Sequence, residues 1–300
     1  MVCRRLLIIT ILCATDIPVV IAQAQPVSLQ PKITYTVIDY PGAFSTTVHG
    51  TNSVGDVVGH FVPPSLATDC GFVLSNGQFS VIDYPGALDT IAYGINDSGQ
   101  IAGAYYLQVG QGDHGFLYDG QNFTPIIVPS REFTEPHGIN NAGDIVGYTG
   151  WSTGSSARSE GFELSGGQLT FIRFPGHYPG QNATGINNLG EIVGVRASPT
   201  IGDIFVYTAG QFQFIDLGPE SGASGVNDSG IIVGSYVNKG VYDGFALWNG
   251  KYITFAYPGA YATLATGISN LGVVVGYYLE AAAGPAHGFV TSPITVEDFR

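Results

Sequence analysis

Short β-prone apolar runs alternate with polar turns along most of the chain, and one ten-residue phrase occurs six times. At residues 94–103 it reads GINDSGQIAG. Related copies begin at Gly50, Gly138, Gly185, Gly225 and Gly267. Successive copies start 40 to 47 residues apart. A period in this range is typical of repeat proteins in which every unit is one supersecondary structure.

The repeated phrase predicts a β-hairpin. Its ends are β-prone, and residues 96–99 between them read NDSG. An Asn side chain can bond its own backbone to open a turn, and a glycine accepts the positive φ that closes it. This pattern fits a type I turn followed by a left-handed bulge residue. The alternative, a calcium loop, needs several carboxylates at alternate positions, whereas each copy has two at most.

Two further strands complete each repeat. One contains a Gly-Phe step, as in residues 115–118 (GFLY), and the other ends in a Pro-Gly turn, as in residues 79–86 (FSVIDYPG). Pro at the second and Gly at the third position of that turn fit type II. We call the hairpin strands A and B, the Gly-Phe strand C and the Pro-Gly strand D.

Six repeats of four antiparallel strands predict an all-β fold, a six-bladed β-propeller. A copy of strand D at residues 33–40 precedes the first strand A, whereas the last repeat supplies only A, B and C at 267–290. We therefore expect the N-terminal strand to complete the sixth blade. Residues 294–299 (ITVEDF) are an alternative closing strand or an edge addition. An open β-solenoid or a pair of β-sandwiches is the alternative fold.

The unit resembles the HAF repeat of exported bacterial proteins. That repeat has a His-Ala-Phe step before a strand and a G-I-N-x-x-G-x-[IV]-[VA]-G phrase. Here the step reads HGF at His114 and His287, and Gly or Ile replaces Ala in every copy, so the chain would be a divergent branch. The resemblance covers residues 33–290. It implies an exported protein of propeller-like form, and it implies no activity, cofactor or catalytic residue.

The N-terminus predicts export. Arg4 and Arg5, an apolar run and an Ala22-Gln23-Ala24 site describe a secretory signal peptide over residues 1–24. We expect residues 25–32 to be a linker and 33–300 to form the propeller, secreted to the extracellular space or periplasm. The apolar run is too short for a membrane span, so no membrane insertion is expected after cleavage. Only Cys70 would then remain, which leaves no internal disulfide.

Charge and motifs exclude several functions. The chain has 23 acidic and 10 basic residues and a net charge of −13. Nucleic acid and anionic membranes are therefore not expected as partners, since both need a basic face. The sequence has no G-x-S-x-G, H-E-x-x-H, Gly-rich phosphate loop or C-x-x-C, which argues against the familiar hydrolase, zinc-protease, nucleotide and thiol-redox classes. We predict no cofactor and no metal.

Strand direction predicts the binding face. The tight A–B and C–D turns share one face of the ring, and the longer B–C and D–A connections share the other, which we call the long-loop face. Variable loops on a rigid scaffold commonly carry binding sites. Residues just before strand A should rim the central channel, and we call them the inner ring: His49, Tyr93, His137, Thr184, Ser224 and Thr266. Residues before strand C form the outer ring: Cys70, His114, Glu160, Asp203, Asp243 and His287.

The outer ring has two interpretations. Glu160, Asp203 and Asp243 could act with His114 or His287 as acid and base on a polymer substrate. Equivalent positions in a repeat usually recur for structural reasons, however, which favours side chains that cap strand C. A zinc ion between His49 and His137 is not expected, because zinc needs three or four ligands within about 2.0–2.3 Å.

Aromatic residues are the main binding candidates on the long-loop face. They are Tyr105, Tyr106, Tyr148, Trp151, Tyr277 and Tyr278, with the inner-ring residues His49, Tyr93 and His137 beside them. Aromatic faces with polar edges suit sugars and proteins alike. Trp151, in a Gly- and Ser-rich stretch, is expected to be the most exposed. The tyrosines of the Pro-Gly turns, Tyr40, Tyr84 and Tyr257, are expected to pack between blades.

These features predict a binding or interaction module for an extracellular glycan or protein. The alternatives are a polysaccharide-acting hydrolase or lyase that uses the carboxylates and histidines of the outer ring, and a structural surface repeat. A glycosidase should bring two carboxyl groups within about 5–9.5 Å of each other. A binding module should present exposed aromatic rings without such a pair, and a structural repeat should show neither.

Overall fold

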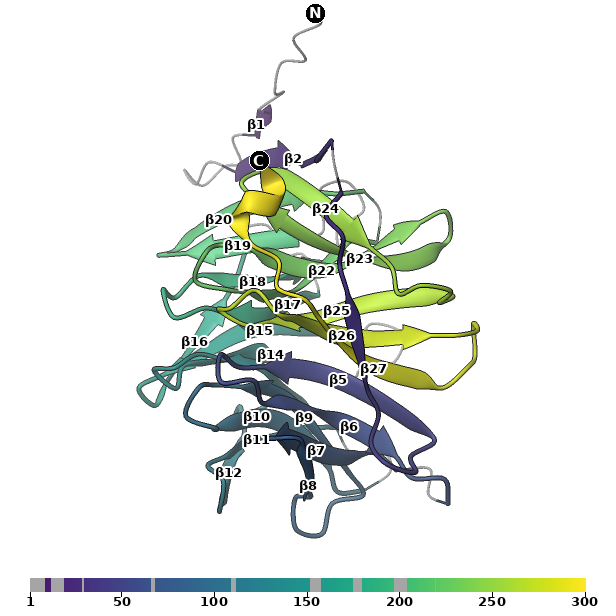
Figure 1. Cartoon of the computed structure of the whole chain (residues 1–300). Coiled ribbons are helices and arrows are strands. Elements are labelled where there is room, and N and C mark those ends of the chain that lie inside the picture. Colours follow the sequence, from purple (N-terminus) through teal and green to yellow (C-terminus); the bar gives the residue numbers. More distant parts are fainter. Residues whose placement is uncertain are drawn as a thin grey trace, which may run out of the picture.

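Six four-stranded antiparallel sheets form the blades of a β-propeller (Figure 1). The computed structural model describes residues 9–11, 19–28, 30–65, 68–108, 112–151, 158–174, 180–196, 204–218 and 220–300. Strands A to D follow one another from the central channel outward, and blade 6 packs against blade 1 through β26 and β5. The predicted six-bladed propeller is confirmed, and the solenoid and sandwich alternatives are wrong.

The strands follow the predicted order in every blade. Blade 1 consists of β5 (Ser45–Thr51), β6 (Val57–Val62), β7 (Cys70–Ser75) and β8 (Gln78–Ile82), and blade 2 of β9 (Asp89–Ile95), β10 (Ile101–Tyr106), β11 (His114–Tyr118) and β12 (Phe123–Ile126). Blade 3 consists of β13 (Phe133–Ile139), β14 (Ile145–Trp151), β15 (Arg158–Ser165) and β16 (Gln168–Ile172), and blade 4 of β17 (Gln181–Ile186), β18 (Ile192–Arg196), β19 (Ile204–Thr208) and β20 (Gln211–Asp216). Blade 5 consists of β21 (Gly222–Val226), β22 (Ile232–Asn238), β23 (Val241–Trp248) and β24 (Lys251–Phe255), and blade 6 of β25 (Ala262–Ile268), β26 (Val274–Leu279), β27 (Ala286–Thr291) and β4 (Tyr35–Ile38).

The N-terminal strand closes the ring as predicted. Strand β4 pairs antiparallel with β27 and places Val37 opposite Phe289. The closure therefore joins two segments from opposite ends of the chain, which lie side by side in Figure 1.

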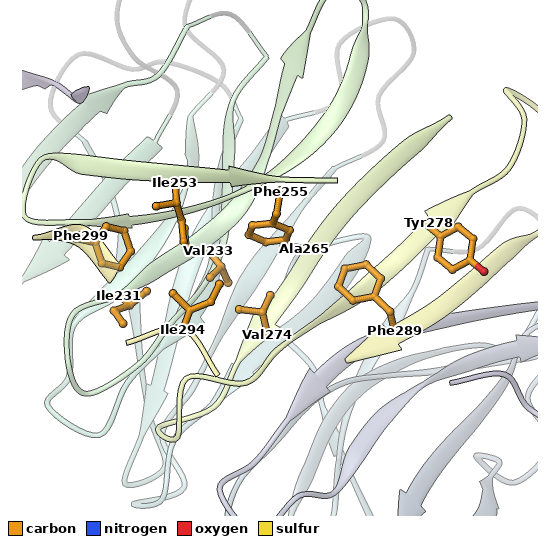
Figure 2. Close-up of a cluster of buried hydrophobic side chains, with 11 residues drawn as sticks. Ile231, Val233, Ile253, Phe255, Ala265, Val274, Tyr278, Phe289, Ile294 and Phe299 are labelled. Carbon is orange, nitrogen blue, oxygen red and sulfur yellow. The ribbon is translucent and has the colours of Figure 1, made fainter. Parts of the chain in front are cut away.

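Residues 294–299 do not form a closing or edge strand. They lead into the 3₁₀-helix η1 (Val296–Phe299), which begins where the Thr295 backbone N–H donates to Asp298 Oδ2 at 2.7 Å. Ile294 and Phe299 are 1% and 0% exposed and fill the space between blades 5 and 6 (Figure 2). The apolar residues of this segment thus fill a gap between two blades. The same pattern of apolar residues is also found in edge strands, so the sequence does not separate the two roles.

In the described part of the N-terminal segment, three short strands precede the propeller. Strand β3 (Gln25–Pro26) pairs in parallel with β24, and Val27 N–H donates to Tyr252 O at 3.0 Å. Strand β2 (Val19–Gln23) pairs in parallel with β20, and β1 (Ile9–Ile11) pairs with β2. Part of the segment predicted as a linker is therefore an ordered edge strand of blade 5.

Each repeated phrase is a hairpin turn, as predicted. In blade 2, Asn96 Oδ1 accepts the backbone N–H groups of Ser98 at 3.2 Å and Gln100 at 3.0 Å. Gly99, with a φ of 80°, takes the left-handed position. The asparagine thus satisfies the turn backbone that no strand partner reaches.

A buried phenylalanine on strand C holds each blade to its neighbour. These six rings are at most 1% exposed: Phe72, Phe116, Phe162, Phe205, Phe245 and Phe289. Phe72 lies opposite Gly59 of strand B, where an added Cβ would come within 3.0 Å of the ring. Burying one phenylalanine contributes about 1.5–3 kcal/mol. The Gly-Phe step is therefore a packing signal.

Candidate functional site

The inner ring lines the central channel as predicted, but its residues lie within strand A rather than before it. The pairing of strands A and B shifts by one residue at this point in all six blades, for example between Val48 and Gly50. His49 and its equivalents are therefore bulge residues, which point their side chains away from the regular pleat. Strand A begins five residues earlier than expected in blade 1, at Ser45 instead of Gly50, so the D–A connection is shorter than predicted.

Six glycines pinch the channel next to the inner ring. They are Gly50, Gly94, Gly138, Gly185, Gly225 and Gly267. A Cβ on Gly185 would lie 2.8 Å from the Gly225 Cα, and one on Gly94 would lie 2.5 Å from His137 O. The free space here is about 70 Å³. The two faces of the ring therefore carry separate surfaces.

A cavity of about 870 Å³ opens to one side of the channel on the long-loop face, over blades 4 to 6. Its position follows from the sizes of the inner-ring side chains. Blades 1 to 3 supply His49, Tyr93 and His137, whereas blades 4 to 6 supply Thr184, Ser224 and Thr266. The rings fill one half of the mouth, and the small residues leave the other half open. This asymmetry breaks the sixfold pattern of the fold.

The cavity has apolar walls and a few polar groups. Val195, Ala223 and Leu264 contribute apolar surface. Two tyrosines, Tyr242 and Tyr277, also line it, and the Tyr242 hydroxyl donates to Glu220 Oε2 at 3.3 Å. Ligand sites in proteins typically have this size and this mixture of surfaces.

Histidine and tyrosine rings form a continuous arc around the closed half of the mouth. The successive ring centroids are 5.1 Å apart between His60 and His49, 4.9 Å between His49 and Tyr93, 4.1 Å between Tyr93 and His137, and 5.0 Å between His137 and Tyr148. His60 was not a candidate from the sequence, because its equivalents on strand B include alanine, valine and serine. His49, the second ring from the His60 end of this arc, also lines the cavity.

The two histidines at this end are hydrogen-bonded. His49 Nε2 and His60 Nδ1 are 3.0 Å apart, and His60 Nε2 lies 3.8 Å from Asp69 Oδ1. Burial, with His60 and His137 nearby, holds the pKa of His49 well below its ordinary value. Burial also lowers the pKa of His60, although Asp69 and Asp89 oppose this shift. The pair is therefore neutral at neutral pH.

A carboxyl pair lies at the other end of the arc. Burial and the adjacent Glu135, with which it shares a hydrogen bond, raise the pKa of Asp113 to about 6. The Tyr148 hydroxyl donates to Glu135 Oε2 at 2.6 Å, and His137 Nε2 lies 3.7 Å from the same oxygen. Burial alone would raise the pKa of Glu135, but the nearby His137 and the hydrogen bond from Tyr148 outweigh it and lower this pKa. Neither carboxyl group was predicted, because the contact joins two blades.

The outer ring does not form one site. Glu160 binds Arg131 Nη2 at 2.5 Å and Arg173 Nε at 3.1 Å, and Asp243 accepts a hydrogen bond from Asn238. His287 Nδ1 is 2.9 Å from Asp39 Oδ2, across the closing strand pair. Glu160 and Asp243 lie on blades 3 and 5, each with its own local partner. His114 lies 5.5 Å from Tyr105, ring to ring, and Asp203 is outside the described residues. These contacts favour the structural interpretation of the ring.

Tyr105 and Tyr278 pack between blades instead of facing a ligand, and are 5% and 6% exposed. Each stacks on the Pro-Gly tyrosine of the preceding blade, at 3.5 Å for Tyr84 on Tyr105 and 3.7 Å for Tyr257 on Tyr278. The third turn tyrosine, Tyr40, stacks on Phe61. The packing predicted for the turn tyrosines is therefore confirmed.

Trp151 is half-buried rather than the most exposed aromatic residue. Its indole N–H donates to Ser130 O at 3.0 Å, and the Arg131 guanidinium lies 3.9 Å from its ring. Phe44, at 61% exposure, is far more accessible. Of the other predicted residues, Tyr277 lines the cavity, Tyr148 belongs to the arc, and Tyr106 is half-buried at the end of β10.

The opposite face carries a ring of amides that joins the blades. Each first asparagine of the repeated phrase donates its side-chain N–H to the same position of the next blade. The donors are Asn52, Asn96, Asn140, Asn187 and Asn227, with donor–acceptor distances of 3.0 to 3.3 Å. The sequence predicted the turn role of these residues and not this second one.

No three His, Cys, Asp or Glu side chains among the described residues are placed to hold a metal ion together. No helix in the described part of the chain is long and apolar enough to cross a membrane.

The fold is similar to that of several solved structures. A gluconolactonase from Xanthomonas campestris matches with a TM-score of 0.54 and 12% identity over 89% of this chain and 96% of its own. An acylaminoacyl peptidase matches with a TM-score of 0.51 and 10% identity over 83% of this chain, which spans 44% of the peptidase. The β-propeller domain of the Trilobed protease from Pyrococcus furiosus matches with a TM-score of 0.46, 10% identity, and 86% and 98% coverage. No family model matches, and no curated protein is detectably similar in sequence. At these identities the likeness shows the fold alone.

Proposed function

We propose that the protein is an exported binding module that holds a neutral, hydroxyl-bearing ligand, such as the sugar units of an extracellular glycan, in the cavity over blades 4 to 6. The observation that carries this proposal is the pair Tyr242 and Tyr277 on the cavity wall. Aromatic rings with polar edges suit the apolar faces and hydroxyl groups of sugars. The signal-peptide pattern and the resemblance to HAF repeats support export.

The cavity is lined by one acidic and one basic side chain, Glu220 and the buried Arg196, and this balance favours a neutral ligand. Glu220 is the one carboxylate among the described residues that line it. The net charge of −13 disfavours an anionic ligand over the whole surface. A single carboxylate also argues against a glycosidase, which needs two carboxyl groups about 5–9.5 Å apart. The carboxyl groups of Asp113 and Glu135, which are neighbours, lie at the other end of the arc and do not line the cavity.

The test is a glycan array with residues 25–300, followed by calorimetric titration of any glycan that binds. Replacing Tyr277 by Ala should weaken binding about 3- to 10-fold, the loss of about 0.5–1.5 kcal/mol of ring contact. Tyr261→Ala is the matched control, because Tyr261 is 44% exposed and does not line the cavity.

Trp151→Ala distinguishes the two candidate surfaces. If Trp151→Ala abolishes binding and Tyr277→Ala leaves it unchanged, the ligand lies on blade 3 and the cavity proposal is wrong. If no glycan on the array binds, the ligand class is wrong.

A further inference from the structure

We infer that the cavity hydrolyses a neutral ester or lactone, with His49 as the general base and with His60 and Asp69 as the residues that position it. This inference rests on the proposed function only through the shared cavity. A sugar that carries an acyl ester would satisfy both, but recognition and hydrolysis are measured by different experiments.

The first observation is a chain of polar groups, joined by one charge contact and one hydrogen bond, that ends at the cavity wall. Asp69 lies 3.8 Å from His60 Nε2, and His60 Nδ1 lies 3.0 Å from His49 Nε2. A nearby carboxylate favours the tautomer of His60 with its proton on Nε2. His60 Nδ1 then accepts the Nε2 proton of His49, which leaves the lone pair of His49 on Nδ1. A base held by a partner that is itself oriented by a carboxylate is the usual arrangement of a catalytic imidazole.

The second observation is the position of His49. It is the one titratable imidazole among the described cavity-lining residues, and the groups around it are His60 from β6, Tyr93 from β9 and His137 from β13. A positive charge on His49 is unfavourable among these neutral rings. A positive charge on His60 is better placed, because Asp69 and Asp89 both stabilise it. A proton taken up at His49 Nδ1 can therefore be matched by transfer of the Nε2 proton to His60.

The backbone around Asp69 is held in place. Its N–H donates to Asp89 Oδ1 at 2.8 Å, which ties the loop before β7 to the start of β9. Asp69 thus keeps its position beside His60 when no ligand is bound. Such support distinguishes a positioned carboxylate from one on a mobile surface loop.

The residues of the cavity limit the reaction class. A glycosidic bond needs a proton donor and a second carboxylate, and an amide needs protonation of a poor leaving group. An ester or lactone has a carbonyl carbon reactive enough for water that one base activates. Ser235 and Asn182 are two of the neutral donors that line the cavity, and either can meet a developing oxyanion. Ser235 Oγ accepts Ala265 N–H, and Asn182 Oδ1 accepts Ser159 O–H, so the Ser235 O–H and the Asn182 N–H groups remain as donors.

The reaction balances without a cofactor. His49 takes a proton from water while the water oxygen forms a bond to the carbonyl carbon. The tetrahedral oxyanion then collapses, the bond to the alcohol oxygen breaks, and the alkoxide takes the proton back from the imidazole. One ester and one water give one acid and one alcohol, with no change in oxidation state.

The test is hydrolysis of p-nitrophenyl esters from acetate to octanoate and of γ- and δ-lactones by residues 25–300. His49→Gln should lower kcat/KM of the best substrate at least about 100-fold, the usual contribution of a general base. His114→Gln is the matched control for non-specific imidazole catalysis and should change it less than 2-fold. Thermal unfolding of each variant shows whether it folds.

The positioning residues have their own signature. Asp69→Asn should lower kcat about 10-fold, leave KM unchanged and move the acid limb of the pH–rate profile to lower pH, because protonated His60 loses its counter-charge. His60→Gln should make the rate of hydrolysis less dependent on pH in the acid limb. It also provides a second variant if His49→Gln does not fold. Hydrolysis that is absent across the panel, or that His114→Gln lowers as much as His49→Gln does, overturns the inference. Glycan binding without hydrolysis overturns the inference alone, and hydrolysis without glycan binding overturns only the ligand class proposed above.

Discussion

The side-chain amide of Asn96 donates a hydrogen bond to the backbone carbonyl of Asn140, 3.0 Å away in the next blade. The same side chain closes its own hairpin turn through Oδ1. One residue of the repeated phrase therefore shapes a turn and ties two blades together. Its recurrence along the chain follows from this double role.

Removing this asparagine in one blade should destabilise the ring. Asn227 Oδ1 accepts two N–H groups of its own turn, and its Nδ2 donates to Ser269 O. Asn227→Ala should cost about 2–4 kcal/mol, because buried backbone groups lose their partners. Asn227→Asp keeps the turn acceptor and loses the inter-blade donor, so its cost should be smaller. Denaturant unfolding measures both, with Ser229→Ala in the same turn as the control. Equal costs for Ala and Asp would show that the inter-blade bond carries the whole effect.

The glycines that pinch the channel should differ in their tolerance of a methyl group. An added Cβ on Gly94 would lie 2.5 Å from His137 O, whereas one on Gly225 would lie 3.3 Å from the Gly267 Cα. Gly94→Ala should therefore cost about 1–3 kcal/mol through overpacking, and Gly225→Ala clearly less. The denaturation midpoints of the two variants check this order, and the reverse order would contradict the close approach at Gly94.

Loss of the closing strand should open the ring. A chain that begins at residue 40 lacks β4, which leaves Phe289 and the edge of β27 exposed. We expect the free energy of unfolding to fall by at least about 3 kcal/mol, the usual cost of losing the packing of one buried aromatic ring. A chain that begins at residue 33 lacks only β1 to β3 and is the control. Similar melting temperatures for the two chains would show that β4 does not hold the ring closed.

Asp113 should make the stability of the protein depend on pH. Its pKa is raised in the folded state to about 6, above the ordinary value of 3.8, so the folded state holds this proton more tightly than the unfolded state. Its contribution is fully present below about pH 3.8 and is lost as pH rises through about 6. Asp113→Asn keeps a donor for Glu135 without the charge, and should gain thermal stability relative to the wild type between pH 4 and pH 7. Melting curves at pH 4, 5, 6, 7 and 8 measure this, and parallel profiles would exclude a role for this carboxyl group.

The parts of the fold that sequence alone predicted are those repeated in every blade. The Asn and Gly of residues 96–99 specify the same turn in each copy, and the extra D strand at residues 33–40 specifies the closure. The strand A bulge escaped prediction, because a one-residue shift leaves the apolar pattern on both sides unchanged. Residues 294–299 were misread because an alternating apolar segment can fill a gap as well as pair with an edge.

The candidate site was only partly predictable, because it depends on differences between blades. The inner ring was named correctly, but the cavity arises where Thr184, Ser224 and Thr266 replace larger rings, and this is a property of the assembled circle. Asp113 and Glu135 meet across a blade boundary whose register the sequence does not give. The outer-ring carboxylate Glu160, for which the structural interpretation was favoured over the catalytic one, binds two arginines, one of them 29 residues away.

The narrow girdle of glycines has a consequence for how such a protein can diversify. The glycines separate the asparagine side chains on one face from the cavity side chains on the other. Substitutions that change the shape of the cavity therefore leave the asparagine hydrogen bonds between blades intact. Substitutions at Tyr277 or Ser235 can thus change the ligand preference without a loss of stability in the propeller. In this molecule, the residues that select the ligand are therefore different from the residues that stabilise the propeller.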